Sequence, residues 1–297
     1  MAEVNKRCVV VTGANKGIGF ATVQQLASHG ITVILTARNE QRGLDAIRKL
    51  QKLQLKGEVL FHQLDVADQD SVNHFSEFVK NKFGKLDILV NNAAVFSGTP
   101  TDVGKVREAL SKYTVNQSEN IVWEEFLVET SEATEECFNI NYYGTKRMCQ
   151  AMIPLLQLSE LPTIVNVTSF AGRLKNITNE GARTLLSDVE NLSEEKIDEL
   201  LKEFLEKAEM GVPVWTTCVN GYTMSKAAIN AYTRILSKEY PLIRINTVCP
   251  GYVKTDMTCN SGFLSAEEGA ESIINLALSG KDCPSGKLFD RKEETSF

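Results

Sequence analysis

The chain has 297 residues, with a hydrophobic fraction of 43% and a charged fraction of 24%. This is the composition of an ordinary globular protein that can bury a large core. A formal net charge of −6 and the lack of any block of basic residues argue against a nucleic-acid partner. No apolar run approaches a membrane span, and the first residues show neither a signal-peptide pattern nor a lipidation motif. We therefore expect no membrane partner and a cytoplasmic location.

The seven cysteines and three histidines are scattered along the chain. Their spacing fits neither a disulfide framework nor a zinc cluster. Zinc-dependent alcohol dehydrogenase chemistry therefore has no candidate ligands, and we expect no metal.

Apolar, β-branched runs alternate with helical segments along the chain. The runs that predict strands lie within 8–20, 31–38, 58–66, 86–94, 163–169 and 243–251, with a late edge strand within 285–290. Helical patterns cover 40–53, 69–83, 131–157 and 222–239. Continuous apolar strands alternating with helices predict an α/β fold, a doubly wound parallel sheet of the Rossmann type. Because the chain has no internal repeat and no low-complexity linker, we expect a single domain over 1–297.

Two segments interrupt this alternation, residues 97–130 and residues 172–219. The second contains a helical pattern with a plausible N-cap at Ser193 and an apolar stripe, formed by Ile197, Leu200, Leu201, Phe204 and Leu205. Two interpretations are open. The stripe is either additional core packing or the inner face of a lid that covers a substrate cleft.

A glycine-rich turn, "TGANKGIG", lies between the first strand and the first helix. Gly13, Gly17 and Gly19 allow a tight turn and a close backbone approach to a pyrophosphate. The N-terminus of the following helix offers free N–H groups and a positive dipole end. At this position in the chain the turn predicts a dinucleotide site.

The second predicted strand ends in Arg38, where an acidic residue would bind the ribose 2′-hydroxyl of NAD. Arg42 follows one turn later, and Lys16 lies inside the glycine turn. Three cations at one corner suit a 2′-phosphate, so the sequence favours NADP(H) over NAD(H).

Two tyrosines stand four positions before a lysine, Tyr222 before Lys226 and Tyr142 before Lys146. In a helix each pair shares one face, a single turn apart. This spacing also arises by chance, so the pattern alone does not identify a catalytic pair.

Taken in order, the motifs resemble those of the short-chain dehydrogenase/reductase family over nearly the whole chain. They are "TGANKGIG", "LDV" with Asp65, "NNAA" at 91–94, "NINYYG" with Asn141, "VNVTS" ending at Ser169, "YTMSK" and "CPGYVKTDM". The two long segments further resemble the monomeric carbonyl-reductase branch of plants, of the salutaridine, menthone and neomenthol reductase type. The family order of asparagine, serine, tyrosine and lysine selects Tyr222 with Lys226 and makes Tyr142 structural.

The resemblance implies a role for each member of that set. Tyr222 would donate a proton to the carbonyl oxygen, with its anion stabilised by Lys226, which would also hold the ribose. Ser169 would hydrogen-bond the substrate oxygen and polarise it, and Asn141 would hold a water that links Lys226 to solvent. The cofactor would carry out the redox step.

The resemblance also assigns the remaining cofactor contacts. Asp65 and Val66 would lie at the adenine, Asn91 beside the ribose, and Val253 and Thr255 at the nicotinamide amide and pyrophosphate. The same motifs add Asn15 and Ile18 of the glycine turn and Pro250 of "CPGYVKTDM".

The resulting expectation is a reductase of a bulky, mostly apolar ketone, with Ser169 and Tyr222 contacting the substrate. The apolar substrate is expected because of the stripe, together with Phe96 and Trp215, which lie in the segments that border the cleft of the resembling enzymes. Two alternatives stay open: an ene-reductase acting on a conjugated C=C bond, and a catalytically silent NADP-sensing module. One relative that reduces C=C carries glutamate in place of Tyr222. We also expect a monomer, because residues 97–130 would cover the helix that carries Asn141.

Overall fold

The computed structural model describes residues 7–115, 125–211, 215–217 and 219–297. Its centre is an eight-stranded sheet in the order β10-β9-β8-β7-β4-β1-β2-β3. The strands are β1 Cys8–Val11, β2 Thr32–Ala37, β3 Val59–Gln63, β4 Ile88–Asn91, β7 Thr163–Val167, β8 Arg244–Cys249, β9 Leu288–Asp290 and β10 Glu293–Thr295. Neighbours are parallel except β9 and β10, which are antiparallel. The predicted fold class is confirmed, and so is a strand within 285–290, which is β9; its predicted place at the edge was wrong, because β10 pairs outside it.

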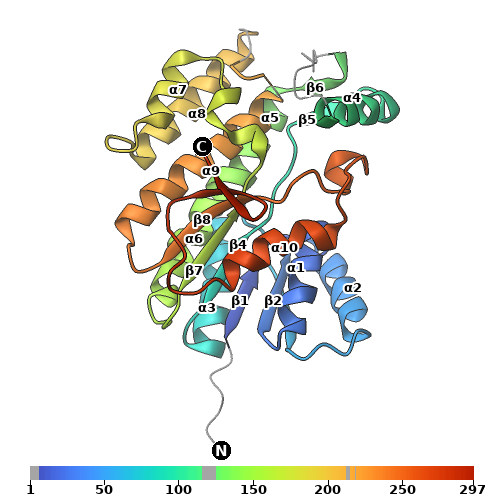
Figure 1. The fold of residues 1–297 in the computed structure, drawn as a ribbon, viewed down its shortest axis with the longest axis vertical. Helices are drawn as coiled ribbons and strands as arrows, with labels where there is room; N and C mark the ends of the chain where they lie inside the picture. The colour runs from blue at the N-terminus through green and yellow to red at the C-terminus, as the bar shows by residue number, and fades with distance from the viewer. Residues whose placement is uncertain (1–6, 116–124, 212–214, 218) are drawn as a thin grey trace, which may run out of the picture.

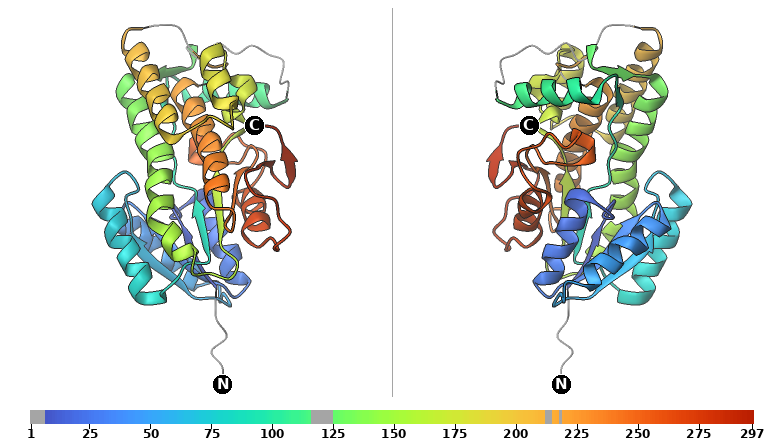
Figure 2. Two further views of the ribbon diagram at one scale, coloured as in Figure 1. Left: turned by 90° about the vertical axis from the view of Figure 1, so that its left-hand side faces the viewer. Right: turned by 90° about the vertical axis from the view of Figure 1, so that its right-hand side faces the viewer.

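Side chains alternate between the two faces of the sheet. Val9 and Val11 of β1 pack on one face, whereas Val10 packs on the other. The first face is covered by α1 Gly17–Ser28, α2 Glu40–Gln51 and α10 Ala266–Ala277. The second is covered by α3 Gln69–Phe83, α6 Gly144–Leu156 and α9 Asn220–Glu239. Figures 1 and 2 show the resulting three layers, and the burial of both faces explains the continuous apolar strands.

The strand order reverses at β1, which lies between β2 and β4 in the sheet. From β1 the chain first adds β2 and β3 on one side and then β4, β7 and β8 on the other. In such sheets a crevice forms at the carboxyl ends of the strands at this point. The glycine turn follows β1 directly and therefore lies at that crevice.

Most helices begin with a side chain that caps their first N–H groups. Asn39 caps α2, Asp68 caps α3, Ser193 caps α8 (Glu194–Glu209), and Ser265 forms a capping box at α10. The prediction of Ser193 as an N-cap is thus confirmed. The helices α1 and α9, which begin at the carboxyl ends of the strands, start differently, since their N-cap residues provide no side-chain cap.

The two long segments form additional elements beyond the carboxyl ends of the strands (Figures 1 and 2). The first contains β5 Gly98–Pro100, α4 Val103–Val115 and β6 Leu127–Glu129, and β5 pairs antiparallel with β6. It leads into α5 Ser131–Phe138 and a π-helical turn, Asn139–Tyr143, before α6. The second contains two 3-10 turns, Phe170–Gly172 and Leu174–Asn176, followed by α7 Glu180–Ser187 and α8.

The apolar stripe of α8 faces the interior of the protein. Four of its members are buried in the core shared with α6 and α9 and the fifth packs against that core: Ile197, Leu200, Leu201, Phe204 and Leu205. The Phe204 ring lies 5.7 Å from Phe138 of α5 and 5.3 Å from Trp215, as measured between centroids. None of these residues lines the pocket described below. The lid interpretation of the stripe was therefore wrong, and the core-packing interpretation fits.

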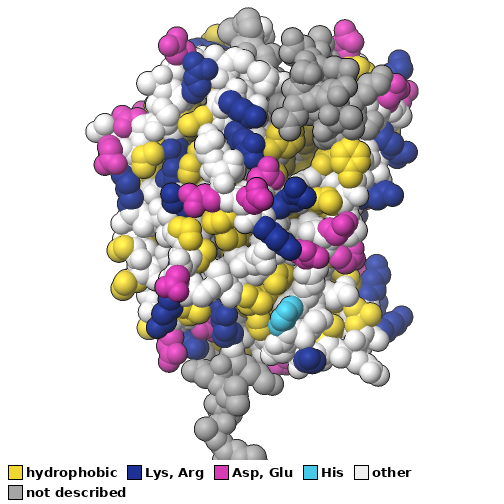
Figure 3. All heavy atoms as spheres, viewed as in Figure 1, with side chains coloured by type: hydrophobic (Ala, Val, Ile, Leu, Met, Phe, Trp, Pro, Cys, Tyr) yellow, Lys and Arg dark blue, Asp and Glu magenta, His cyan; other side chains and the backbone are white. Residues whose placement is uncertain are grey.

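The surface carries charges of both signs. On the face seen in Figure 3, basic and acidic side chains are interspersed. Close ion pairs occur at the surface, for example Lys292 with Glu271 at 3.1 Å and Lys287 with Glu294 at 2.9 Å. Among the helices of the described ranges, none combines the length and the apolar character that a bilayer crossing would require.

Candidate active site

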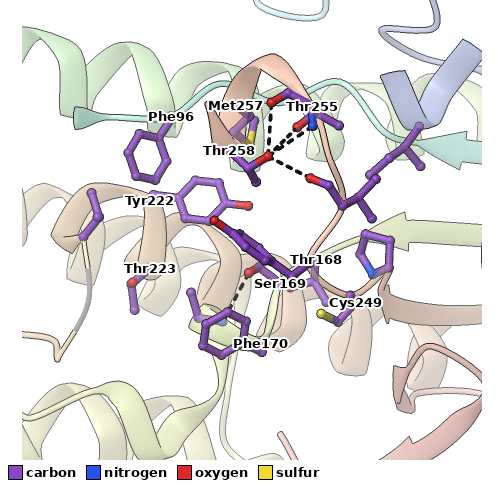
Figure 4. Close-up of a pocket in the computed structure, with 17 residues that line it drawn as sticks. Phe96, Thr168, Ser169, Phe170, Tyr222, Thr223, Cys249, Thr255, Met257 and Thr258 are labelled. Atoms are coloured by element: carbon purple, nitrogen blue, oxygen red, sulfur yellow. Dashed lines mark hydrogen bonds between the residues drawn. The ribbon is translucent and has the colours of Figure 1, made fainter. Parts of the chain in front are cut away.

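A pocket opens at the carboxyl ends of the strands, between the glycine turn and the start of α9. It encloses about 880 Å³ of empty volume, including its open mouth. Ile18 of the glycine turn, Ser169 after β7 and Tyr222 of α9 contribute to its wall. Pro250, Val253 and Thr255 of the segment after β8 complete the opposite side, and Figure 4 shows the arrangement. Residues predicted for the cofactor and for catalysis thus border one cavity.

Tyr222 presents its phenol to this pocket, with Ser169 close to it (Figure 4). Its ring lies 5.2 Å from the ring of Phe96, between centroids. Burial raises the pKa of the Tyr222 phenol above its ordinary value, and a hydrogen bond with the Ser169 hydroxyl opposes that rise. The phenol is therefore protonated at neutral pH and can act as a proton donor.

Lys226 lies one helical turn beyond Tyr222 and is only 2% exposed. Its Nζ is 5.7 Å from the centroid of the Tyr222 ring and donates a hydrogen bond of 2.9 Å to the carbonyl of Val167. Burial lowers the pKa of Lys226 from 10.5 to about 8. Within the described part of the chain no carboxylate forms an ion pair with it, so its charge remains available to the phenol.

Asn141 lies behind this pair, in the π-helical turn between α5 and α6. Its side-chain oxygen accepts from the Val95 N–H at 2.8 Å, and its amide donates to the Val95 carbonyl at 3.0 Å. The same amide donates to the Ser225 hydroxyl at 3.0 Å. Since Ser225 precedes Lys226, Asn141 ties the segment after β4 to the catalytic turn of α9.

The glycine turn has the close contacts that the sequence predicted. A Cβ at Gly13, where φ is +62°, would lie 2.8 Å from Ala93 Cα. A Cβ at Gly19 would lie 2.5 Å from the Asn92 amide nitrogen. Only glycine fits both positions. The turn carries a half-exposed Asn15 and leads into α1, whose N-cap residue, Lys16, leaves the first N–H groups without a side-chain cap.

The three predicted 2′-phosphate cations lie after the carboxyl ends of β1 and β2, which are neighbours in the sheet. Arg38 and Arg42 are exposed, and an Arg38 guanidinium nitrogen is 3.9 Å from Glu136. Lys16 Nζ lies 2.5 Å from Asp256, a residue of "CPGYVKTDM" to which the sequence analysis gave no role. Both pairs are well exposed, so they are weak and can exchange partners.

Asn91, which the sequence analysis placed beside the ribose, has a buried side chain. Its amide donates to Asn166 Oδ1 at 2.8 Å and to Cys149 Sγ at 3.3 Å, on the α6 face of the sheet. Its side chain is 4% exposed and engaged by these two partners, and the place of Asn91 beside the ribose stays a prediction. Asp65 and Val66 follow β3, and the Asp65 carboxylate accepts from the N–H of Ala67 at 3.0 Å.

The second Tyr-x-x-x-Lys pair has a different environment. Lys146 Nζ lies 6.0 Å from the Tyr142 ring centroid, 3.0 Å from Glu194 and 2.9 Å from Asp198 of α8. Burial opposes the charge of Lys146, but the hydrogen bonds and attraction of the two carboxylates outweigh it and raise the pKa of Lys146. Tyr142 is fully buried and does not border the pocket.

Several pocket residues were not predicted. Phe170, Tyr252 and Met257 border the cavity, and each adjoins or belongs to a motif that the sequence analysis quoted. The segments around these motifs follow the pocket wall, so their neighbouring residues could have been predicted to border the pocket as well. Phe96 borders the pocket as predicted, whereas Trp215 packs against Phe204 in the core.

Comparison with known proteins agrees with this geometry. A family model described as short chain dehydrogenase matches residues 7–182, and one described as enoyl-(acyl carrier protein) reductase matches residues 205–283. The chain is 51% identical over 303 residues to (+)-neomenthol dehydrogenase of Arabidopsis thaliana, with 100% of both chains covered. It is 32% identical over 304 residues to carbonyl reductase (NADPH) 1 of Bos taurus, covering 97% of this chain and 98% of the other.

A solved structure, that of salutaridine reductase from Papaver somniferum, superposes with a TM-score of 0.87 at 42% identity. The match covers 96% of this chain and 100% of that one. The extra helices and the pocket therefore belong to a shared architecture. Together, the family model, the relatives that align over nearly their full length and the matching fold show that the chain is an oxidoreductase of the short-chain dehydrogenase/reductase family, whose members use NAD(P)(H).

Proposed function

We propose that this protein is an NADPH-dependent carbonyl reductase that interconverts a bulky, mostly apolar ketone and its secondary alcohol. The observation that carries the proposal is the arrangement around Tyr222. A protonated phenol borders an apolar pocket, contacts the Ser169 hydroxyl, and has 5.7 Å from its ring a lysine that no carboxylate of the described residues pairs with. This combination supplies a proton and stabilises the anion left behind.

In the proposed reduction, the Tyr222 phenol donates its proton to the substrate's carbonyl oxygen. The Ser169 hydroxyl hydrogen-bonds the same oxygen and holds it within reach of the phenol. The ammonium of Lys226 stabilises the phenolate as it forms, and its bond to the Val167 carbonyl fixes its position. Asn141 fixes the backbone at Val95 and the turn of α9 next to Lys226. We assign Asn141 this positioning task, because its side chain is already engaged by protein groups.

The residues of the crevice fit a bound nicotinamide dinucleotide. At Gly13 and Gly19 a side chain would collide with the segment after β4, so glycine is needed for the tight turn that would bring the backbone close to a pyrophosphate. The N-terminus of α1, without a side-chain cap, offers N–H groups to the same anion. When bound there, the cofactor would supply the hydride that reduces the carbonyl carbon. Ile18, Val253 and Thr255 border the pocket where its nicotinamide end would lie.

The preference for NADPH rests on Arg38 and Arg42. Replacing both by alanine removes charge-assisted contacts to a 2′-phosphate, each contributing about 1.5–3 kcal/mol. Since both side chains are exposed, we expect the lower end of that range and an NADPH Kd at least about tenfold weaker. The NADH Kd, measured by the same fluorescence titration, should hardly change. Equal weakening for both coenzymes would show that these arginines support the fold instead.

The substrate class rests on the wall of the pocket. Phe96, Phe170, Val219, Tyr252 and Met257 surround the phenol, so the cavity offers a broad apolar surface with few fixed polar groups. The names of the relatives, a neomenthol dehydrogenase and a salutaridine reductase, agree with a cyclic terpenoid or alkaloid ketone. Each additional methylene that is buried should strengthen binding by about 0.8 kcal/mol.

A panel of ketones tests both parts of the proposal. NADPH oxidation should be faster, and KM lower, for menthone-sized cyclic ketones than for acetone-sized or polar carbonyls. With a conjugated enone, product analysis should show an alcohol that keeps its C=C bond. Loss of the C=C bond would support the ene-reductase alternative. Absence of turnover despite tight NADPH binding would support an NADP-sensing module.

We also propose that the protein is a monomer. The expectation placed residues 97–130 over the helix of Asn141, but along their length α9 is covered by α7 and α8 of the second segment, and α5 by α8. Covering these helices would block an isologous contact through them. A mass near 32.9 kDa in sedimentation at all concentrations is expected, and a stable tetramer would contradict it.

A further inference from the structure

The N-terminus of the helix that carries Tyr222 is held by a residue far away in the sequence. The N-cap residue of α9, Val219, has no side chain that can accept a hydrogen bond. The Glu129 carboxylate at the end of β6 takes this place. It accepts from the N–H of Asn220 at 2.9 Å and from the N–H of Gly221 at 3.1 Å. A negative charge at this end of a helix is also favoured by the helix dipole.

The next N–H group belongs to Tyr222 itself, and Ser97 accepts it at 2.9 Å. Ser97 in turn donates to Glu129 at 2.5 Å. The following N–H, that of Thr223, makes the first regular helical bond, to the Val219 carbonyl at 2.9 Å. The first N–H groups of a helix have no acceptor within the helix. At α9 their acceptors are two side chains of the β5–β6 hairpin, that is, the antiparallel strands β5 and β6 together with Ser97, which directly precedes β5.

This arrangement contrasts with that of α1, the other helix that begins at the pocket without its own side-chain cap. At α1 the free N–H groups suit a phosphate. At α9 the protein itself provides the anion. The first helix end is thus suited to a ligand, and the second is fixed before any ligand arrives.

The β5–β6 hairpin packs closely against the start of α9. Glu129 is paired with Gly98 in the β5–β6 register, directly after Ser97, so the two acceptors lie side by side. A Cβ at Gly221 would lie 2.8 Å from Thr134 and 3.0 Å from Ser97, which shows how closely the hairpin and α5 approach the helix. The residue before Ser97 is Phe96, whose ring contacts the Tyr222 ring. One hairpin therefore holds both the backbone and the ring of Tyr222.

We propose that Glu129, assisted by Ser97, is a positioning residue that sets the backbone of Tyr222 and thereby aims its phenol at the substrate oxygen. This inference rests on the proposed role of Tyr222 as proton donor. A displacement of the donor by an ångström lowers the rate of proton transfer strongly, so the hydrogen bonds of Glu129 act on turnover rather than on coenzyme binding. A helix cap with a purely structural role would lower stability alone.

The test uses the full-length protein with NADPH and its best ketone. Glu129→Ala should lower kcat at least about tenfold, while the NADPH Kd stays within about twofold. Glu129→Gln keeps one acceptor oxygen and should recover part of the loss. Glu125→Ala, which truncates an exposed side chain of the same segment, is the matched control and should keep full activity. Circular dichroism and thermal unfolding identify any variant that is not folded at the assay temperature.

A double-mutant comparison shows whether Glu129 acts through the phenol. When Tyr222 is already Phe, adding Glu129→Ala should cost no more than about a further twofold in kcat, because there is no proton donor left to misplace. The inference would be overturned if Glu129→Ala lowered kcat by the same factor in the Tyr222→Phe enzyme as in the native enzyme. A folded Glu129→Ala enzyme with normal kcat would overturn it as well. If Glu129→Ala does not fold, Ser97→Ala removes the acceptor of the Tyr222 N–H together with the hydroxyl that donates to Glu129, and it should lower kcat several-fold; normal kcat there would equally overturn the inference. Full activity of Tyr222→Phe alone would instead contradict the proposed function.

Discussion

Two tyrosine–lysine pairs with the same spacing lie on neighbouring helical elements of this protein, and they serve different ends. Tyr222 with Lys226 borders the pocket, whereas Tyr142 with Lys146 lies in the core between the π-helical turn and α8. The internal geometry is nearly the same, with the lysine nitrogen 5.7 Å from the ring centroid in one pair and 6.0 Å in the other. Geometry within the pair therefore does not decide its function.

The surroundings of the lysine decide it. Lys146 is neutralised by Glu194 and Asp198, and these contacts attach α8 to α6. Lys226 is buried with only a carbonyl as its hydrogen-bond partner among the described residues, so its charge acts on the phenol and on whatever binds beside it. Among the described residues, the proposed catalytic pair has a lysine without a carboxylate next to a phenol at a pocket wall, and this distinguishes it from the other pair.

The largest expected effect is on the two tyrosines. Tyr222→Phe removes the proton donor and keeps the ring, so kcat should fall at least about a hundredfold with the NADPH Kd nearly unchanged. Tyr142→Phe is the matched control and should stay active, because its hydroxyl does not reach the pocket. Steady-state kinetics and a coenzyme titration on both variants measure this. Near-normal turnover of Tyr222→Phe would refute the catalytic assignment.

The second effect separates the two lysines by pH. In the proposed reduction the protonated form of Lys226 is the active one, and burial lowers its pKa to about 8. As pH rises through that value the ammonium is lost, so kcat/KM for ketone reduction should fall about tenfold per pH unit above it. Lys146 has a raised pKa and keeps its charge over this range, so Lys146→Met should show the same alkaline limb. A profile that stays flat to pH 10 in the native enzyme would contradict this account of Lys226.

The sequence predicted those features whose determinants lie close together in the chain. The alternation of β-branched runs and helices predicted the sheet, because the runs that form β1, β2, β4, β7 and β8 are buried on both faces. The glycine turn and the residues around Ser169 and Tyr222 were predicted because each motif occupies a single strand end or helix turn.

Features that depend on distant partners were predicted less well. The stripe on α8 indicated that something apolar covers it, but not whether the cover is a substrate or the helices α5 and α9. Asn91 follows the strand period, which turns its side chain toward Asn166 on the α6 face. Glu129 lies 91 positions before Asn220, and no local pattern connects them. In each case the missing information was the tertiary partner.

The smallest expected effect on activity, and the clearest on stability, concerns Lys146. Lys146→Met leaves Glu194 and Asp198 without their cation in a site where the lysine side chain is only 15% exposed. The two carboxylates then repel each other, and the free energy of unfolding should fall by about 2 kcal/mol. Urea denaturation measures this change, and kcat and KM should remain within about twofold because α8 does not border the pocket.

The control for that variant is Lys202→Met. Lys202 pairs with Glu206 at 3.9 Å on the same helix, but the two side chains are 78% and 57% exposed. Exposed pairs contribute little, so the stability of this variant should hardly change. If Lys146→Met lowered kcat in a folded protein as strongly as Tyr222→Phe does, the second pair would take part in the chemistry. The carboxylates beside Lys146 would then no longer distinguish a structural pair from a catalytic one.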